Sequence, residues 1–180
     1  MKRKMMAFLL AQLLVFSFSI TCFGASTLPP KKQTVLAKYV TAKQAYEKYS
    51  QDPANVKILD ARTIGEYVFV GHAPMAVNIP LKFLDRGLTD KNKPVMPTNE
   101  NFVSEVTKRF KKTDQILVMC RSGARSAACV NLLAKAGFND VYTITDGFEG
   151  DKDDQGQRTV NGWKNSGAPW TFKLDPALVY

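Results

Sequence analysis

The chain has 180 residues, of which 45% are hydrophobic and 23% are charged, and its formal net charge is +9. This length and balance suit one globular domain with a short appendage, and they exclude a disordered chain or a fibrous repeat. The basic residues are scattered and are not interleaved with aromatic residues, so nucleic acid is not expected as a partner.

The amino terminus indicates an export signal. A basic start, 2–4, precedes a mostly apolar run, 5–20, and small residues follow at 24–26. Because the run is shorter than the roughly 18–20 residues of a membrane-spanning helix, cleavage is expected. Cleavage after Ala25 removes three positive charges and no negative ones, which takes the net charge from +9 to +6. We therefore expect a periplasmic or secreted protein, bound to a membrane only if the signal stays uncleaved.

A lipoprotein acylated at Cys22 is a weaker alternative, because the three residues before Cys22 match the usual pattern poorly. The expected organisation is a signal peptide at 1–25, a linker at 26–34, one domain at 35–172 and a C-terminal tail at 173–180. Cleavage would leave two cysteines, Cys120 and Cys129, which make neither a disulfide framework nor a C-x-x-C pair.

Within the domain, helical and strand patterns alternate. Thr41 and Gln44 have the spacing of a capping box, which predicts a helix that runs to about Tyr49. After it we expect a buried strand at 56–60, a short strand at 76–79, a surface excursion at 86–98, a helix at 99–112, a buried strand at 115–119, a helix at 126–136 and a strand at 141–145. This alternation predicts an α/β domain with a mostly parallel sheet.

The loop at 120–126 is the most informative segment, because it follows a buried strand and precedes a helix. Ligand sites in parallel sheets lie beyond the carboxyl ends of strands. The loop amides can curl around one centre where Gly123 relaxes the backbone, and the helix adds its positive amino end. Arg121 and Arg125 add two permanent positive charges. We therefore expect Cys120 to be an anionic nucleophile beside an anion-binding cradle.

These motifs resemble the rhodanese family over about residues 39–170. The matching segments are Asp60-Ala61-Arg62, Glu66-Tyr67, Gly71-His72-Ala73-Pro74, Asn78-Ile79-Pro80, the loop 120–126, Gly137-Phe138, Asp146-Gly147-Phe148 and Gly162-Trp163. The resemblance implies a three-layer rhodanese-like fold, with helices on both faces of a mostly parallel sheet. It also implies a sulfurtransferase that moves a sulfane sulfur from thiosulfate, or a related donor, to a thiophilic acceptor.

By that resemblance Cys120 is the catalytic residue and carries the sulfur as a persulfide. The residues expected to bind the substrate are Arg121, Ser122, Gly123, Ala124, Arg125 and Ser126. Asp60 and Arg62 are expected either to form an ion pair that braces the cysteine loop or to be an ordinary strand-end pair. No metal or organic cofactor is indicated. The expected partners are a small anionic sulfur donor and a thiophilic acceptor, and a protein sulfur acceptor is a further candidate.

Other functions of a reactive cysteine fit these residues less well. A cysteine hydrolase needs a histidine base, and the only histidine, His72, lies in a segment that suits loop bracing. A cysteine phosphatase would have five residues between its cysteine and arginine, whereas four separate Cys120 from Arg125. The remaining alternative is a sulfur-carrier or redox-regulatory binding module without turnover. Cys129 is expected to pack in the core, with a resolving thiol for Cys120 as the alternative.

Overall fold

The computed structural model describes residues 28–180. The predicted signal peptide, Cys22 and the start of the predicted linker lie outside the described residues. The helices are α1 (Ala42–Gln51), α2 (Ile64–Val70), α3 (Phe102–Arg109) and α4 (Ala124–Lys135). The strands are β1 (Tyr39–Val40), β2 (Val56–Asp60), β3 (Val77–Asn78), β4 (Gln115–Met119) and β5 (Val141–Ile144).

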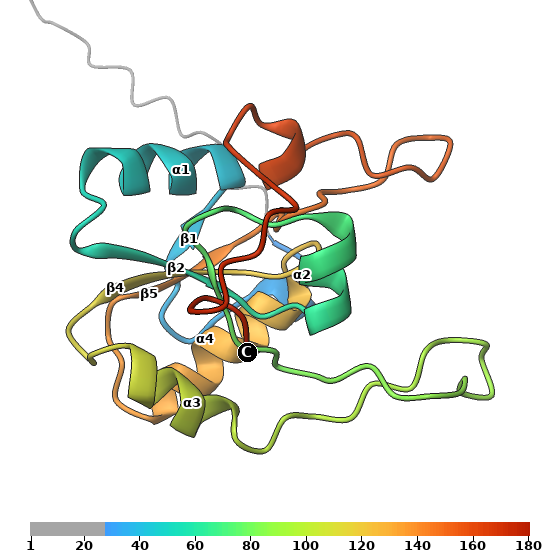
Figure 1. Ribbon diagram of the computed structural model, residues 1–180, viewed down its shortest axis with the longest axis horizontal. Helices are drawn as coiled ribbons and strands as arrows, with labels where there is room; N and C mark the ends of the chain where they lie inside the picture. The colour runs from blue at the N-terminus through green and yellow to red at the C-terminus, as the bar shows by residue number, and fades with distance from the viewer. Residues whose placement is uncertain (1–27) are drawn as a thin grey trace, which may run out of the picture.

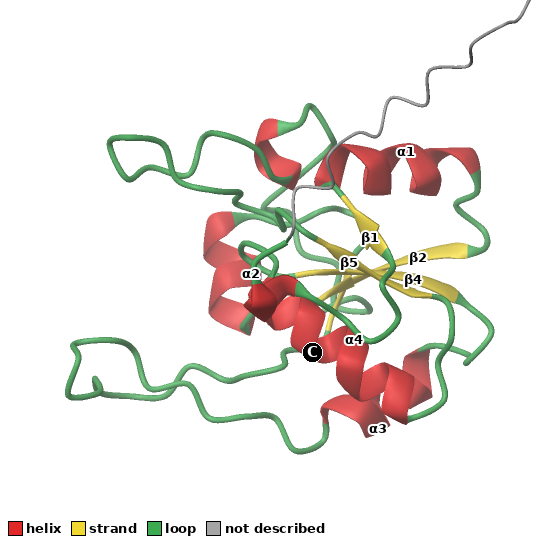
Figure 2. Ribbon diagram, turned by 180° about the vertical axis from the view of Figure 1, so that it is seen from behind, coloured by secondary structure: helices red, strands yellow, loops and turns green. Residues whose placement is uncertain are grey.

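The five strands form one sheet in the order β1-β5-β4-β2-β3, and every pairing in it is parallel. Helices cover both faces (Figure 1; Figure 2). Side chains of α1 and α2 share one buried cluster with the sheet, and side chains of α3 and α4 share a second cluster on the opposite face. The predicted α/β fold with a parallel sheet between two helical layers is therefore confirmed.

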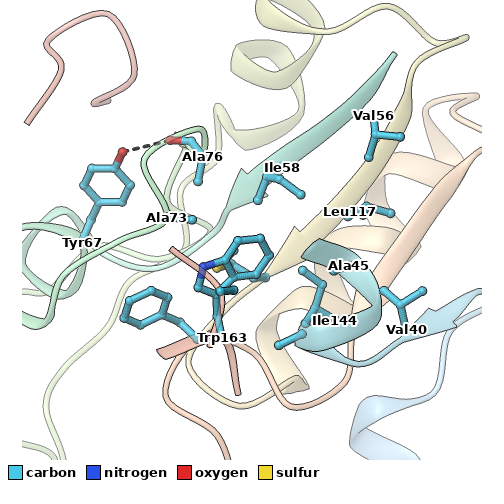
Figure 3. Close-up of a cluster of buried hydrophobic side chains, with 14 residues drawn as sticks. Val40, Ala45, Val56, Ile58, Tyr67, Ala73, Ala76, Leu117, Ile144 and Trp163 are labelled. Carbon is cyan, nitrogen blue, oxygen red and sulfur yellow. Dashed lines mark hydrogen bonds between the residues drawn. The ribbon is translucent and has the colours of Figure 1, made fainter. Parts of the chain in front are cut away.

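The cluster under α1 and α2 is completed by residues from the C-terminal third of the chain (Figure 3). Trp163 is fully buried in it, and its indole N–H donates to the carbonyl of Pro169 at 2.8 Å. Tyr67 of α2 is also fully buried, and its hydroxyl donates to the carbonyl of Ala76 at 2.9 Å. The segment after β5 thus belongs to the same buried cluster as α2.

Capping boxes begin both helices of that layer. The predicted box at Thr41 and Gln44 is confirmed, because each side chain accepts the backbone N–H of the other residue. The same reciprocal pairing joins Thr63 to Glu66 at the start of α2. We did not predict α2, which has only seven residues and too few turns to show an apolar periodicity.

Helix α3 is shorter than the predicted 99–112. Asn99 does not join the helix, because its buried side chain donates to the carbonyl of Pro80 and its oxygen accepts the N–H of Asn101. At the other end Phe110 takes an extended conformation, which lets its ring enter the core, where it is only 6% exposed. Tertiary contacts at both ends therefore override the helical pattern.

Two arms extend from the same side of the domain in both views (Figure 1; Figure 2). The first, 82–98, includes the surface excursion predicted at 86–98, and its two halves pair through backbone hydrogen bonds such as Phe83 N–H to Pro97 O at 2.9 Å. The second arm spans 151–161, with a bridge between Lys152 and Arg158. Within residues 28–180 no helix is both long and apolar enough to cross a membrane.

The segments that flank the predicted domain pack against it. In the described part of the predicted linker, a single helical turn at Pro30–Lys32 contacts α4. In the predicted tail, the carbonyl of Leu178 accepts the N–H of Asn78 on β3 at 2.7 Å. The carbonyl of Ala177 accepts a hydrogen bond from Arg109 at 2.6 Å. The tail therefore covers the edge of the sheet beside β3.

Candidate active site

Cys120 follows β4 directly and is 1% exposed. Its carbonyl accepts the N–H of Phe148 at 2.7 Å, and the carbonyl of Arg121 accepts the N–H of Glu149 at 3.0 Å. A side chain at Gly147 would meet Cys120 O at 2.4 Å, so only a glycine allows this approach. The segment after β5 thus holds the start of the cysteine loop through two backbone hydrogen bonds.

The loop turns one amide toward the sulfur. The N–H of Gly123 donates to Cys120 Sγ at 3.2 Å. Gly123 has φ +99°, and a Cβ there would lie 2.1 Å from the carbonyl oxygen of Thr145. The N–H groups of Ser122, Ala124 and Arg125 have no acceptor within the described part of the chain. These three donors of the loop therefore remain free for an incoming atom or anion.

Ser126 lies on the inner side of the loop and is fully buried. Its Oγ is 3.7 Å from Cys120 Sγ and 3.0 Å from the carbonyl oxygen of Gly123. It also lies 2.8 Å from Oγ1 of Thr143 on β5. Since a hydroxyl can donate or accept, Ser126 can accept from a thiol and donate to a thiolate while Thr143 holds it in place.

The two arginines of the loop differ in a way that the sequence did not predict. Arg121 is exposed and belongs to no ion pair among the described residues. Arg125 instead makes a bidentate pair with Glu66, with Nη1 at 2.7 Å from Oε2 and Nη2 at 2.5 Å from Oε1. Both arginines carry the expected charge, but that of Arg125 is paired with Glu66. Arg125 ties the start of α4 to α2, and Arg121 keeps an unpaired charge.

This ion pair shifts both partners. Burial alone would raise the pKa of Glu66, but the hydrogen bonds and charge of Arg125 outweigh it and lower that pKa from 4.5 to about 2. Burial also opposes the charge of Arg125, yet hydrogen bonding to Glu66 raises the pKa of Arg125 above its ordinary value. Both groups are therefore ionised at neutral pH, and the pair links the cysteine loop to α2.

We predict that Glu66→Gln lowers the free energy of unfolding at pH 7 by roughly 2–3 kcal/mol. The folded pKa of Glu66 lies below its unfolded value, so its stabilisation is complete above about pH 4.5 and is lost as the pH falls toward 2. Urea unfolding of both proteins between pH 7 and pH 3 measures this. The difference between them should shrink below about pH 4.5, and a difference independent of pH would contradict the assignment.

Asp60 and Arg62 form a completely buried ion pair behind the loop. Arg62 Nη2 lies 2.6 Å from Asp60 Oδ2 and donates to the carbonyl of Gly71 at 2.8 Å. The guanidinium also stacks on the ring of Phe148, 4.0 Å from its centroid, and the N–H of Phe148 donates to Cys120 O. Because the pair is buried and contacts the residue that holds Cys120, its geometry fits bracing rather than an ordinary strand-end pair.

The surroundings of Cys129 and His72 fit a structural role for both residues. Cys129 is fully buried in α4, and both it and Cys120 are free thiols. Burial, with the charge of Cys120 adding to it, raises the pKa of Cys129 well above its ordinary value, which disfavours a resolving thiolate. His72 stacks on Tyr67, and its two ring nitrogens lie 3.0 Å from Tyr67 O and 3.2 Å from Lys173 O. Its ring thus joins α2 to the C-terminal segment.

Several residues that shape the site were not predicted from the sequence. Glu66, Thr143 and the backbone of Phe148 all reach the cysteine loop from other elements. Only Glu66 carried a readable signal, since Thr63 three residues before it has the capping-box spacing. Among the described residues no group of three or more His, Cys, Asp or Glu side chains is arranged to hold a metal ion.

Comparison with known proteins gives the family. A model described as the rhodanese-like domain matches residues 41–154. An uncharacterized protein of Rickettsia prowazekii is 33% identical over 118 residues, which cover 66% of this chain and 85% of that protein. The chloroplastic thiosulfate sulfurtransferase 16 of Arabidopsis thaliana is 36% identical over 95 residues, which cover 53% of this chain and 72% of that protein.

Solved structures share the fold. A crystal structure of a protein from M. tuberculosis superposes with a TM-score of 0.63 at 28% identity and covers 76% of this chain and 98% of that one. The rhodanese-like domain of an Anabaena protein superposes with a TM-score of 0.52 at 21% identity, over 74% of this chain and 77% of that one. The second likeness concerns the fold alone.

Proposed function

This chain belongs to the rhodanese-like domain family, and from that premise we propose that it is a sulfurtransferase. Cys120 would take a sulfane sulfur from thiosulfate, or a related donor, and pass it to a thiophilic acceptor. The observation that carries the proposal is the buried sulfur of Cys120, which accepts the Gly123 N–H at 3.2 Å in a loop with three further amides that have no acceptor among the described residues. The likeness to a thiosulfate sulfurtransferase of Arabidopsis thaliana supports the same chemistry.

In the first half-reaction the Cys120 thiolate attacks the outer sulfur of thiosulfate. A bond forms between Sγ and that sulfur, the S–S bond of thiosulfate breaks, and its electron pair leaves with sulfite. The total charge of −3 is unchanged, because the enzyme thiolate becomes an anionic persulfide. The free amides of Ser122, Ala124 and Arg125 are the donors available to the added sulfur. Arg121, unpaired and exposed, is the charge available to the sulfite group.

In the second half-reaction a thiophilic acceptor attacks the outer sulfur of the persulfide. The new bond joins the acceptor to that sulfur, and the electron pair of the broken S–S bond returns to Cys120 Sγ. The Gly123 amide, which donates to Cys120 Sγ, is available to this sulfur as it regains the electron pair. One site can therefore serve both steps without a further oxidant or reductant.

The proposal extends to place and partners. The basic and apolar residues at 2–20 support a location of the reaction in the periplasm or outside the cell. The partners would be a small anionic sulfur donor and a thiophilic acceptor, with a protein as one candidate acceptor. Fractionation of cells that express the full chain, with sequencing of the mature amino terminus, tests the location. A chain that starts at Met1 in the cytoplasm would contradict it.

The function is tested by loading and turnover. We expect one added sulfur atom on Cys120 after incubation with thiosulfate, located by peptide mass spectrometry, and thiocyanate formation when cyanide is added. Steady-state rates with thiosulfate, mercaptopyruvate and glutathione persulfide would identify the donor. Loading without turnover to any small acceptor would favour a sulfur-carrier module. An absence of loading by all three donors would rule out the proposed chemistry.

A further inference from the structure

A groove runs between the cysteine loop and the arm 82–98. It has a volume of about 1,030 Å³, and Arg121 and Arg125 line it on the side of the loop. On its other side lie residues of the arm, which extends beyond the body of the domain in both views (Figure 1; Figure 2). Because Arg121 directly follows the buried Cys120, a macromolecular partner that lies along this opening would contact the loop that carries the sulfur. We call it the basic groove.

The charges in the basic groove are unbalanced. Arg125 and Glu66 neutralise one another through their bidentate pair. Four cationic side chains then remain against one carboxylate, that of Asp90, and the four are Lys82, Lys91, Lys93 and Arg121. None of these four belongs to an ion pair among the described residues. A concave surface with this excess of one sign attracts an anionic partner and orients it during encounter.

The groove also offers apolar contacts. Leu84, Pro94 and Met96 line it, and Leu84 is 58% exposed. No aromatic side chain lines it, so it lacks the stacking surface with which proteins hold single-stranded nucleic acids. Aliphatic side chains beside lysines instead suit a polypeptide that carries carboxylates and small apolar residues.

Its size points the same way. Thiosulfate has only five heavy atoms and would need only the amides of the cysteine loop. Binding of thiosulfate therefore does not explain the arm. A segment of polypeptide would fill the length of the groove and could bring a cysteine to the loop. Thus charge, apolar lining and size all favour an extended acidic segment.

We propose that the basic groove docks an acidic segment of a protein thiol, which takes the sulfur from Cys120. This inference rests on the proposed function, because it presupposes the persulfide. The partner thiolate attacks the outer sulfur, a bond forms between these two atoms, and the electron pair of the broken S–S bond stays on Cys120 Sγ. The partner leaves as a persulfide, and no electrons enter or leave the pair.

The test compares two synthetic peptides, each with one cysteine. In one the cysteine is flanked by Glu and Asp, and in the other by Gln and Asn. The protein is loaded with thiosulfate and freed of excess donor, and transfer is followed as the gain of one sulfur by the peptide in mass spectrometry. Each rate is divided by the rate with dithiothreitol, a small uncharged acceptor. We expect an advantage of about tenfold for the acidic peptide at low salt, lost at high salt.

The triple variant Lys82→Glu/Lys91→Glu/Lys93→Glu should abolish this advantage, and the milder Lys82→Gln/Lys91→Gln/Lys93→Gln should reduce it. Lys91 and Lys93 are exposed and Lys82 is half-buried without an ion-pair partner, so both variants should keep their thermal stability. The matched control changes three exposed lysines outside the groove, Lys111→Glu/Lys112→Glu/Lys173→Glu, and alters the net charge equally. It should keep the preference of the natural protein.

The outcomes separate the two proposals. Failure of thiosulfate to load Cys120 would refute the proposed function itself. Complete loading with equal transfer to both peptides, or an equal loss in the groove variant and the control, would refute only the docking. Tighter binding of a single-stranded oligonucleotide than of the acidic peptide, released by the groove reversal, would also overturn it.

Discussion

Cys120→Ser is expected to abolish sulfur loading and to lower turnover on the order of 10⁴-fold or more, to the rate without protein. A serine hydroxyl is a far weaker nucleophile at neutral pH, and it cannot carry a persulfide. The fold should survive, because the hydroxyl can still accept the Gly123 N–H and contact Ser126. Mass spectrometry after thiosulfate treatment and a thiocyanate assay measure the two effects.

The matched control is Cys129→Ala, which removes the only other thiol of the described residues. Cys129 is fully buried, so its loss should cost about 1 kcal/mol of stability through a small cavity. Loading and turnover should stay within about twofold of the natural protein, since its raised pKa disfavours the thiolate. If Cys120→Ser still takes up sulfur, or if Cys129→Ala no longer does, then Cys129 and not Cys120 carries the sulfur.

The parts of the fold predicted from the sequence are those with a local signal. The strands at 56–60 and 115–119 are mostly apolar, with Ile58-Leu59 and the run 116–118 buried, because they lie inside a parallel sheet with both faces covered. Strand β1 has two residues and helix α2 has seven, which is too short for a period to be seen. The ends of α3 depend on the side chains of Asn99 and Phe110, whose partners are distant in the chain.

In the site, too, the features with a local sequence signal were predicted and the long-range contacts were not. Cys120, Gly123 and Ser126 occupy one short loop, so their order in the sequence already indicated a curled backbone with its helix. The pairing of Arg125 with Glu66 crosses 59 positions, and nothing in the loop indicates that one arginine is neutralised. Charge in a site therefore cannot be counted from the loop alone.

Asp60 and Arg62 illustrate a third case, in which the pair was visible but its environment was not. Two residues apart at a strand end, they could equally have faced solvent. Their burial follows from Phe148 and the carbonyl of Gly71, which close over the guanidinium from two other segments. Only the assembled fold distinguishes a bracing pair from a surface pair, and the energetic consequences differ widely.

We predict that Arg62→Met lowers the free energy of unfolding by about 3–5 kcal/mol. Methionine fills part of the space but leaves the carboxylate of Asp60 buried without its counter-ion and the carbonyl of Gly71 without this donor. Urea unfolding at pH 7 measures the loss. Arg86→Met is the matched control, because Arg86 is exposed, and it should cost less than about 0.5 kcal/mol.

A double-mutant cycle separates the charge from the packing. Asp60→Asn removes the buried charge while keeping the shape, so Arg62→Met should cost less in its presence than in the natural protein. The expected coupling energy is about 1–3 kcal/mol, because both partners share one hydrogen-bonded network. Additive losses would mean that Arg62 acts through its contact with Phe148 and its hydrogen bond to Gly71, and not through Asp60. In that case the pair would stabilise the cysteine loop by packing, and the opposite charges two residues apart would contribute nothing measurable to it.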